Sequence, residues 1–373
     1  MRDLLISAHT PVLRSGRALR TYGVARALAA RGGLDLLYTR FEGDEPDATF
    51  RAIPGIEFHE VRTTRGSRRV LSYAKARLAR IPITVARGIS PDLATHAARL
   101  AALPNRGLVV ADGPLVATTL AQLSRKRAVV YNAHNFESGF RHELGIPRSG
   151  SPRTLMAFER GLLRRASESW MVSQADLAAA HELCPSARLR YVPNVVDVAA
   201  IEPTTPLVAE RRAMFVANFA YKPNQTGLRF LLEEVLPSVW RELPDARLTL
   251  IGAGLEQRPS SDPRVEALGF VDDLAATYAR ASCAVVPLLQ GGGTPLKLIE
   301  ALAYGLPVVA TPRAVAGLSL RGGEHCLVAD GGAAFAEALV QVLREGAPEI
   351  ARAGRRLAEE RYSIEALSAL LST

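Results

Sequence analysis

Lys297 and Glu300 are the two charged residues of the otherwise apolar segment LKLIEALA, which spans residues 296–303. Residues three apart on a helix share a face, so this spacing predicts a base and an acid side by side. An apolar helix is buried among its neighbours, and buried charges need partners. A lysine bound to phosphate and a carboxylate bound to sugar hydroxyls would provide them. The spacing also allows a mutual ion pair on the protein surface.

Three glycines, at positions 291–293, stand shortly before this helix. Thr294 suits its N-cap and Pro295 its first helical position, and Gly305 suits its C-terminal end. The preceding segment CAVVPLL (283–289) predicts a strand. In a parallel strand–helix–strand unit, the unpaired amides of the helix start then face the edge where ligands bind. Because glycines let a ligand approach the backbone closely, the segment predicts a phosphate or diphosphate site.

His134 is a third residue that could do chemistry, because it stands at the end of a predicted strand (128–134) and has Asn132 and Asn135 nearby. A lone histidine is often a structural hydrogen-bonding residue, but a position at a strand end favours contact with a ligand. Asp112 ends another predicted strand, GLVVAD (107–112). The Gly113-Pro114 pair that follows favours a turn-forming aspartate over one that faces a ligand.

Metal binding is not expected, because the histidines, cysteines and carboxylates lack the spacing of metal ligands. Cys184, Cys283 and Cys326 are far apart and lie in apolar surroundings. They are therefore predicted to be reduced core thiols, which favours a cytoplasmic location. No apolar run approaches the ~18 residues of a membrane-spanning helix.

The net charge of +9 is partly local, because eight basic residues and no acid lie within residues 61–87. A basic block favours peripheral contact with an anionic membrane or a lipid-linked partner. A solvated helix face is the alternative. The segment lacks an aromatic array on which bases could stack, so nucleic acid is not an expected partner.

With 373 residues the chain is too long for one ordinary core, and two domains are expected. Apolar strand-like runs alternate with helical patterns throughout, which predicts two parallel sheets covered on both faces. The segment 191–207 is rich in proline and has no helical period, so it marks the domain boundary. Ligands of such folds bind at the carboxyl edges of the sheets, and we expect a cleft there.

The stretch EALAYGLPVVAT (300–311) resembles the signature of the retaining glycosyltransferases of family 4, which have the GT-B fold of two Rossmann-like domains. The resemblance implies that Glu300 binds the ribose of a nucleotide-sugar donor. The family's first glutamate is replaced here by Gly292, and its Phe-Gly pair by Thr294-Pro295. Since Pro295 has no N–H, the implied phosphate donors are the amides of Thr294, Leu296 and Lys297.

Other segments are similar to parts of the same family. In 214–231, Asn218 stands at the usual arginine position, which leaves Lys222 as the basic residue beside Lys297. Backbone atoms of Phe270 and Val271 are expected to contact the nucleobase. In 15–32, Gly16 belongs to a glycine loop expected to lie against the diphosphate, and the segment around His134 resembles those of related sugar transferases.

The resemblance implies an acceptor-binding domain of residues 1–195, a donor-binding domain of residues 196–355, and a helix at about 356–373 that crosses back to the first domain. The expected activity is metal-independent, retaining transfer of a sugar from a nucleotide-diphosphate sugar to an unidentified glycan, lipid-linked or natural-product acceptor. The alternatives are a nucleotide-sugar 2-epimerase of similar fold and a non-catalytic nucleotide-sugar-binding protein. The expected catalytic residues are His134, Lys222 and Lys297, and the expected donor-binding residues are Gly16, Asn218, Phe270, Val271, Gly292, Gly293, Thr294, Pro295, Leu296 and Glu300.

Overall fold

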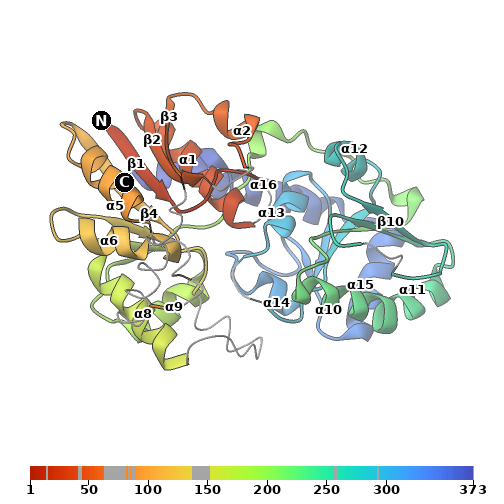
Figure 1. The fold of residues 1–373 in the computed structure, drawn as a ribbon. Helices are drawn as coiled ribbons and strands as arrows, with labels where there is room; N and C mark the ends of the chain where they lie inside the picture. The colour runs from red at the N-terminus through yellow and green to blue at the C-terminus, as the bar shows by residue number, and fades with distance from the viewer. Residues whose placement is uncertain are drawn as a thin grey trace. The chain divides into compact units, whose positions relative to one another are not determined.

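The computed structural model describes residues 1–13, 16–40, 44–62, 81–82, 85, 90–136, 152–255, 259–291 and 294–372. The chain forms two compact units (Figure 1). The first contains Met1–Asn194 and Leu367–Thr373, and the second contains Val195–Ala366.

The first unit is built on a seven-stranded parallel sheet with the strand order β3-β2-β1-β4-β5-β6-β7. The order in which the chain adds strands reverses between β1 and β4, which is the topological switch point where ligands of such sheets bind. The strands are β1 Arg2–Ser7, β2 Leu34–Arg40, β3 Ile56–Arg62, β4 Arg106–Asp112, β5 Val130–Asn132, β6 Glu168–Met171 and β7 Leu189–Tyr191.

Helices cover this sheet, and its central strands are accordingly buried along nearly their whole length. The core joins Leu4 and Ile6 of β1 to Leu93, Leu120 and other residues of the covering helices. The helices are α1 Gly16–Ala30, α2 Ala48–Arg51, α5 Pro91–Ala101, α6 Ala117–Leu123, α8 Pro152–Arg165 and α9 Gln174–Leu183, with the 3₁₀ turn Pro114–Val116 before α6.

The second unit repeats this architecture with a six-stranded parallel sheet in the order β10-β9-β8-β11-β12-β13. Its switch point lies between β8 and β11. The strands are β8 Arg212–Val216, β9 Arg247–Ile251, β10 Val265–Gly269, β11 Cys283–Val286, β12 Val308–Ala310 and β13 Leu327–Val328.

Two apolar cores lie on the two faces of this sheet, and successive residues of β8 belong to different ones. Phe215 packs in the core that includes Phe335, and Met214 packs in the core that includes Ile299. The helices of this unit are α10 Lys222–Phe230, α11 Leu236–Glu242, α12 Leu274–Tyr278, α13 Leu296–Ala303, α14 Pro312–Val315, α15 Gly332–Glu345 and α16 Pro348–Arg361, and a π-helical turn, Leu231–Val235, links α10 to α11. The last helix, α17 Ile364–Ser372, begins in this unit, and its residues from Leu367 onward belong to the first unit. Short 3₁₀ turns occur at Val198–Ala200 and Val208–Glu210.

The C-terminal segment differs from the single helix expected at about 356–373. It comprises the last part of α16 and all of α17, separated at Tyr362 and Ser363. The hydroxyl of Tyr362 accepts a hydrogen bond from the amide of Ser319, and Arg355 of α16 donates to the carbonyls of Ile201 and Ala303. These contacts hold α16 within the second unit, and only the residues from Leu367 onward belong to the first.

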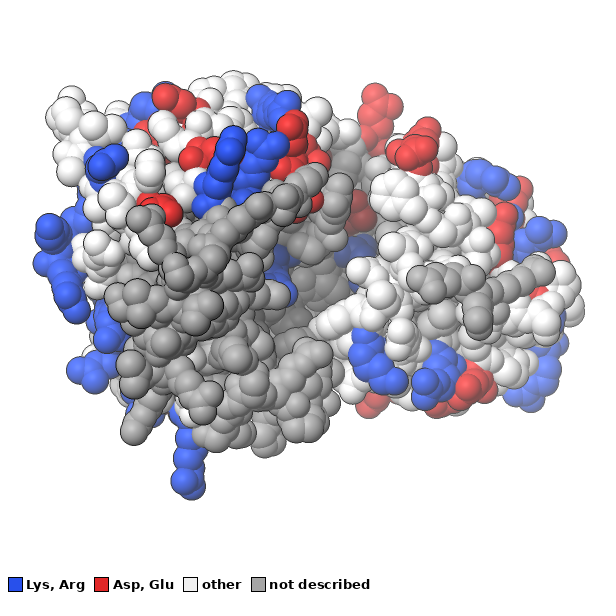
Figure 2. Space-filling view, in the orientation of Figure 1, with Lys and Arg blue, Asp and Glu red and all other residues white. Residues whose placement is uncertain are grey.

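All three cysteines are free and buried, which confirms the prediction of reduced core thiols. Within the described residues, no helix is both long enough and apolar enough to cross a bilayer. Most of the basic stretch 61–87 lies outside the described residues. Lys and Arg side chains are interspersed with Asp and Glu over the described surface visible in Figure 2.

Candidate functional site

The loop between β11 and α13 carries the backbone expected to meet phosphate. Gly291 has a φ of 120°, a conformation that favours glycine. Its carbonyl accepts a hydrogen bond from Nε of Arg313, at 2.7 Å. Arg313 lies on α14, after the next strand, and its contact with this loop was not predicted. Gly292 and Gly293 lie outside the described residues.

Helix α13 begins one residue later than the sequence predicted. Pro295, not Thr294, is the N-cap, with extended angles of φ −74° and ψ 104°, and Leu296 is the first helical residue. The Pro295 carbonyl accepts the amide of Leu298 at 2.9 Å. Leu296 and Lys297 therefore supply the first amides of the helix, and Gly305, with φ 75°, follows its C-cap.

The Lys297 ammonium is held on the inner side of α13. Its Nζ donates to Oδ1 of Asn224 at 2.5 Å and lies 5.0 Å from the centroid of the Phe215 ring. Burial lowers the pKa of Lys297 to about 7. Since an amide oxygen carries no full charge, the lysine has a hydrogen-bond partner at Asn224 but no counter-ion there.

Asn224 links the two segments that flank the switch point of the second sheet. It lies on α10, which follows β8, whereas Lys297 lies on α13, which follows β11. Its Nδ2 donates to the carbonyl of Asn218 at 2.7 Å. Asn224 was not among the predicted site residues, although a polar residue in the first turn of a helix that follows a strand is a detectable signal.

Glu300 is supported from a different side. Its Oε2 accepts a hydrogen bond from the Tyr278 hydroxyl at 3.3 Å. The Tyr278 ring is stacked on that of Tyr304, with centroids 4.0 Å apart and planes 12° apart. Burial raises the pKa of Glu300 to about 7, against the opposing effect of the Tyr278 hydrogen bond.

Lys297 and Glu300 therefore have separate partners, and the mutual ion pair that their spacing allowed is not among the ion pairs of the described residues. The lysine and the glutamate share one helix. Burial disfavours the charged form of both, lowering the pKa of the lysine and raising that of the glutamate. Such perturbed pairs are typical of functional sites.

The other predicted donor residues lie at the surface of the same unit. Lys222 is exposed at the first position of α10. Asn218 is exposed, and its Oδ1 accepts the amide of Ala220 at 3.0 Å. Phe270 follows β10 with 79% of its surface exposed, and Val271 is partly buried.

In the first unit, Asp112 and His134 lie together at the carboxyl ends of β4 and β5. Asp112 is the last residue of β4 and pairs in register with Asn132, the last residue of β5. Asp112 is only 2% exposed, and its carboxylate accepts three side-chain hydrogen bonds. The donors are Thr21 Oγ1 at 2.7 Å, Asn132 Nδ2 at 2.7 Å and His134 Nε2 at 2.9 Å.

This network corrects the turn-forming role predicted for Asp112, because its oxygens bind side chains of other segments. Burial raises the pKa of Asp112, but the charge of His134 and the hydrogen bonds from His134, Thr21 and Asn132 outweigh it, so the pKa lies below its usual value. The buried carboxylate is therefore ionised at neutral pH.

Arg20 of α1 extends the network. Its guanidinium donates to Asn132 Oδ1 at 2.7 Å, Asn194 Oδ1 at 3.1 Å and the Val192 carbonyl at 3.0 Å. Burial lowers the pKa of Arg20 to about 10, against the attraction of Asp112. Gly16 is the exposed first residue of the same helix, and a side chain at this position would have open space around its Cβ.

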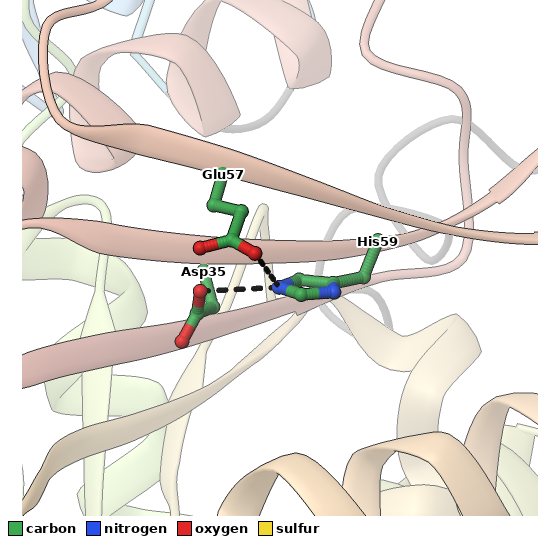
Figure 3. Close-up of side chains that lie close together, drawn as sticks. All are labelled: Asp35, Glu57 and His59. Atoms are coloured by element: carbon green, nitrogen blue, oxygen red, sulfur yellow. Dashed lines mark hydrogen bonds and ion pairs between the residues drawn. The ribbon is translucent and has the colours of Figure 1, made fainter.

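A third group of ionisable residues lies at the opposite, amino edge of the first sheet (Figure 3). His59 Nε2 is 3.1 Å from Asp35 Oδ1 and 3.9 Å from Glu57 Oε1, a geometry that could hold a metal ion. Arg106 forms an ion pair with Asp35, and Arg2 lies 3.4 Å from Asp35 and 3.6 Å from Glu57. These cations already offset the carboxylates, so the group is best described as an ion-pair cluster.

Comparison with known proteins finds a family match in the second unit. Residues 210–345 match the family model described as Glycosyl transferases group 1. A phosphatidyl-myo-inositol mannosyltransferase from Mycobacterium leprae is 32% identical over 164 residues, which are 41% of this chain and 44% of that protein. The chain thus spans less than half the length of the curated relatives that it matches.

Solved structures resemble the whole chain. Sucrose-phosphate synthase from Thermosynechococcus elongatus superimposes with a TM-score of 0.72 at 18% identity, covering 100% of this chain and 97% of that one. Anabaena HepE in complex with UDP and glucose gives a TM-score of 0.69 at 16% identity, with 99% and 98% covered. The chain therefore has the GT-B fold of glycosyltransferases. Within its second unit, residues 210–345 match the glycosyl transferases group 1 model.

Proposed function

We propose that this chain is a glycosyltransferase of the retaining family 4 type. It would transfer a sugar from a nucleotide-diphosphate sugar to a glycan, lipid-linked or natural-product acceptor, without a bound metal ion. The pair Lys297 and Glu300 carries this proposal. Both side chains are partly buried, and this burial disfavours their charged forms. They lie at the end of the sheet where ligands of this fold bind, inside the region that matches the family model.

Lys297 and the start of α13 would neutralise the diphosphate. The departing nucleoside diphosphate gains negative charge as the glycosidic bond breaks, and preorganised donors stabilise that charge. The Lys297 ammonium is already held in place by Asn224, and the amides of Leu296 and Lys297 open the helix. Since these groups supply positive electrostatic potential themselves, the proposed reaction needs no metal. Lys222 would contribute a more solvent-exposed charge.

Glu300 would bind the ribose hydroxyls of the donor. A carboxylate accepts hydrogen bonds from two neighbouring hydroxyls, and the Tyr278 hydroxyl leaves most of its acceptor capacity available. Binding would favour the ionised form, which burial disfavours in the ligand-free protein. The backbone at Phe270 and Val271 would meet the nucleobase.

The relatives support a nucleotide-sugar donor. One is named as a mannosyltransferase, and HepE was solved with UDP and glucose. We assign acceptor or sugar binding in the first unit to His134. We also propose a cytoplasmic location, supported by three buried free thiols. Peripheral membrane contact through the basic 61–87 stretch is part of the same proposal.

Turnover of a donor panel tests this function. Thermal shift would first find which of UDP, GDP and ADP, and which of their sugars, stabilise the protein. The responding nucleotide sugar would then be incubated with and without candidate acceptors, and products would be identified by mass spectrometry and NMR. We expect donor hydrolysis or transfer. Conversion of the donor sugar to its 2-epimer without acceptor would instead identify an epimerase, and binding without any turnover would identify a binding protein.

A further inference from the structure

Asp112 fixes which nitrogen of His134 carries a proton. An ionised carboxylate can only accept hydrogen bonds, and Nε2 of His134 lies 2.9 Å from Asp112 Oδ1. Nε2 must therefore be the protonated nitrogen in the neutral ring. Nδ1 is left with a lone pair, and it has no hydrogen-bond partner among the residues that the structure describes.

Gly113 fixes the orientation of the same ring. A Cβ at this position would lie 2.7 Å from Cε1 and 2.8 Å from Nδ1 of His134, so the ring occupies space that any other residue would fill. Gly113 has a φ of 78°, which also favours glycine. The imidazole is thus held at one edge by Asp112 and packed against the Gly113 backbone.

The donors around Asp112 keep its carboxylate in place. Thr21 binds Oδ2, which leaves Oδ1 for Asn132 and His134. Arg20 in turn holds the Asn132 amide by its oxygen, so Nδ2 of Asn132 is directed to Asp112. In this series of hydrogen bonds, the donor and acceptor roles of each side chain are therefore set by its neighbour in the series.

We propose that Asp112 and Gly113 are positioning residues for His134, holding its ring so that Nδ1 accepts a hydrogen bond from a sugar hydroxyl. A hydroxyl can donate to this lone pair, whereas a fully ionised phosphate cannot. The identification of the ligand as a sugar rests on the proposed function, but the control of the tautomer does not. The hydroxyl belongs to the transferred sugar of the donor or to the acceptor.

Nitrogen-15 NMR of the ligand-free protein tests the tautomer directly. His134 would be assigned from the signal lost in His134→Gln. We expect the neutral ring of the wild-type protein to carry a proton on Nε2 and none on Nδ1. Asp112→Asn, whose amide can either donate or accept, should allow both tautomers. Thr21→Val keeps the carboxylate and should keep the wild-type tautomer. A proton on Nδ1 in the wild type, or an unchanged tautomer in folded Asp112→Asn, would overturn the proposal.

Gly113→Ala provides a second variant in case Asp112→Asn does not fold. It keeps Asp112 but places a methyl group where the ring lies. We expect the His134 ring resonances to shift and kcat/KM to fall at least tenfold. Wild-type ring resonances and wild-type kcat/KM in this variant would show that Gly113 does not position the ring.

Kinetic measurements then show whether Asp112 acts by positioning His134 or has a role of its own. Asp112→Asn and His134→Gln should each lower kcat/KM about tenfold or more, and the double variant should be no slower than His134→Gln. Fully additive losses would contradict action through His134. If the Nε2 tautomer is confirmed but no sugar transfer is found, the proposed function is rejected and the control of the His134 tautomer by Asp112 still holds.

Binding measurements identify the hydroxyl. If it belongs to the donor, His134→Gln weakens nucleotide-sugar binding without changing nucleoside diphosphate binding. If it belongs to the acceptor, only the KM for the acceptor rises. An equal loss of affinity for the nucleoside diphosphate would assign His134 to phosphate and overturn the hydroxyl role.

Discussion

The ammonium of Lys297 and the amide oxygen of Asn224 lie 2.5 Å apart, and this hydrogen bond joins α13 to α10. The two helices follow β11 and β8, the neighbouring strands at which the strand order of the second sheet reverses. The lysine is thereby held in place by a neutral partner and not by a counter-ion. A site of this kind is prepared for an anion before the anion arrives, which is the basis of electrostatic preorganisation.

Asn224→Asp should weaken nucleoside diphosphate binding about tenfold or more. The new carboxylate would form an ion pair with Lys297, raise the pKa of its ammonium and offset its positive charge. Calorimetric titration at low salt would measure the dissociation constants. Gln225→Glu is the matched control, because it adds a negative charge at the next, exposed position of α10. Equal losses of affinity in the two variants would show that any negative charge added to α10 has this effect, without a specific role for the contact with Lys297.

Lys297→Met should change how stability depends on pH. The folded pKa of Lys297 is about 7 and its usual value is 10.5, so between these values the unfolded chain binds the extra proton. The free energy of unfolding of the wild type should therefore rise with pH over this window, by at most about 1.4 kcal/mol per pH unit. In Lys297→Met this contribution is lost.

Urea unfolding followed at pH 7 and pH 9.5 would measure the effect. Lys222→Met, at an exposed position of the same unit, should retain the wild-type dependence. A Lys297→Met protein with the full wild-type slope would contradict the assigned burial of the ammonium.

Tyr278→Phe should lower donor affinity by about threefold to tenfold without unfolding the second unit. The variant keeps the ring that stacks on Tyr304 but removes the hydroxyl that donates to Glu300 at 3.3 Å. Glu300 would lose its positioning contact. Circular dichroism would confirm folding, and calorimetry would give the affinity. Wild-type affinity in the folded variant would remove Tyr278 from the site.

Arg20→Lys should destabilise the first unit by about 2–4 kcal/mol. A lysine cannot reproduce the separate guanidinium contacts with Asn132, Asn194 and Val192, and at least one buried acceptor would lose its donor. Arg17→Lys on the exposed side of the same helix is the control and should be within about 0.5 kcal/mol of wild type. A comparable loss of stability in both variants would mean that the buried hydrogen bonds of Arg20 contribute little to the stability of the first unit.

The sequence predicted the parts of the site that lie close together in the chain. Lys297 and Glu300 share a helix, and their spacing indicated a common face. Their partners Asn224 and Tyr278 come from other helices, so no local pattern could pair them. The same holds for Asp112, whose carboxylate binds side chains from α1 and β5 as well as His134.

Two local predictions were wrong for identifiable reasons. At the start of α13, Pro295 takes extended angles and its carbonyl accepts the Leu298 amide, so the helix begins one residue later than its cap signals suggested. At Asp112, the Gly-Pro pair indicated a turn, but a turn signal does not say where the aspartate side chain points. The roles of Lys222, Asn218 and the nucleobase-binding backbone stay predictions.

The affinity of Glu300→Ala for the stabilising nucleotide sugar tests the central claim most directly. Loss of a carboxylate that accepts ribose hydroxyls should weaken binding about tenfold to a hundredfold, as measured by calorimetry on folded protein. Glu345→Ala, on the exposed end of α15 in the same unit, should bind like wild type. Wild-type affinity in folded Glu300→Ala would contradict the assignment of this carboxylate to the donor.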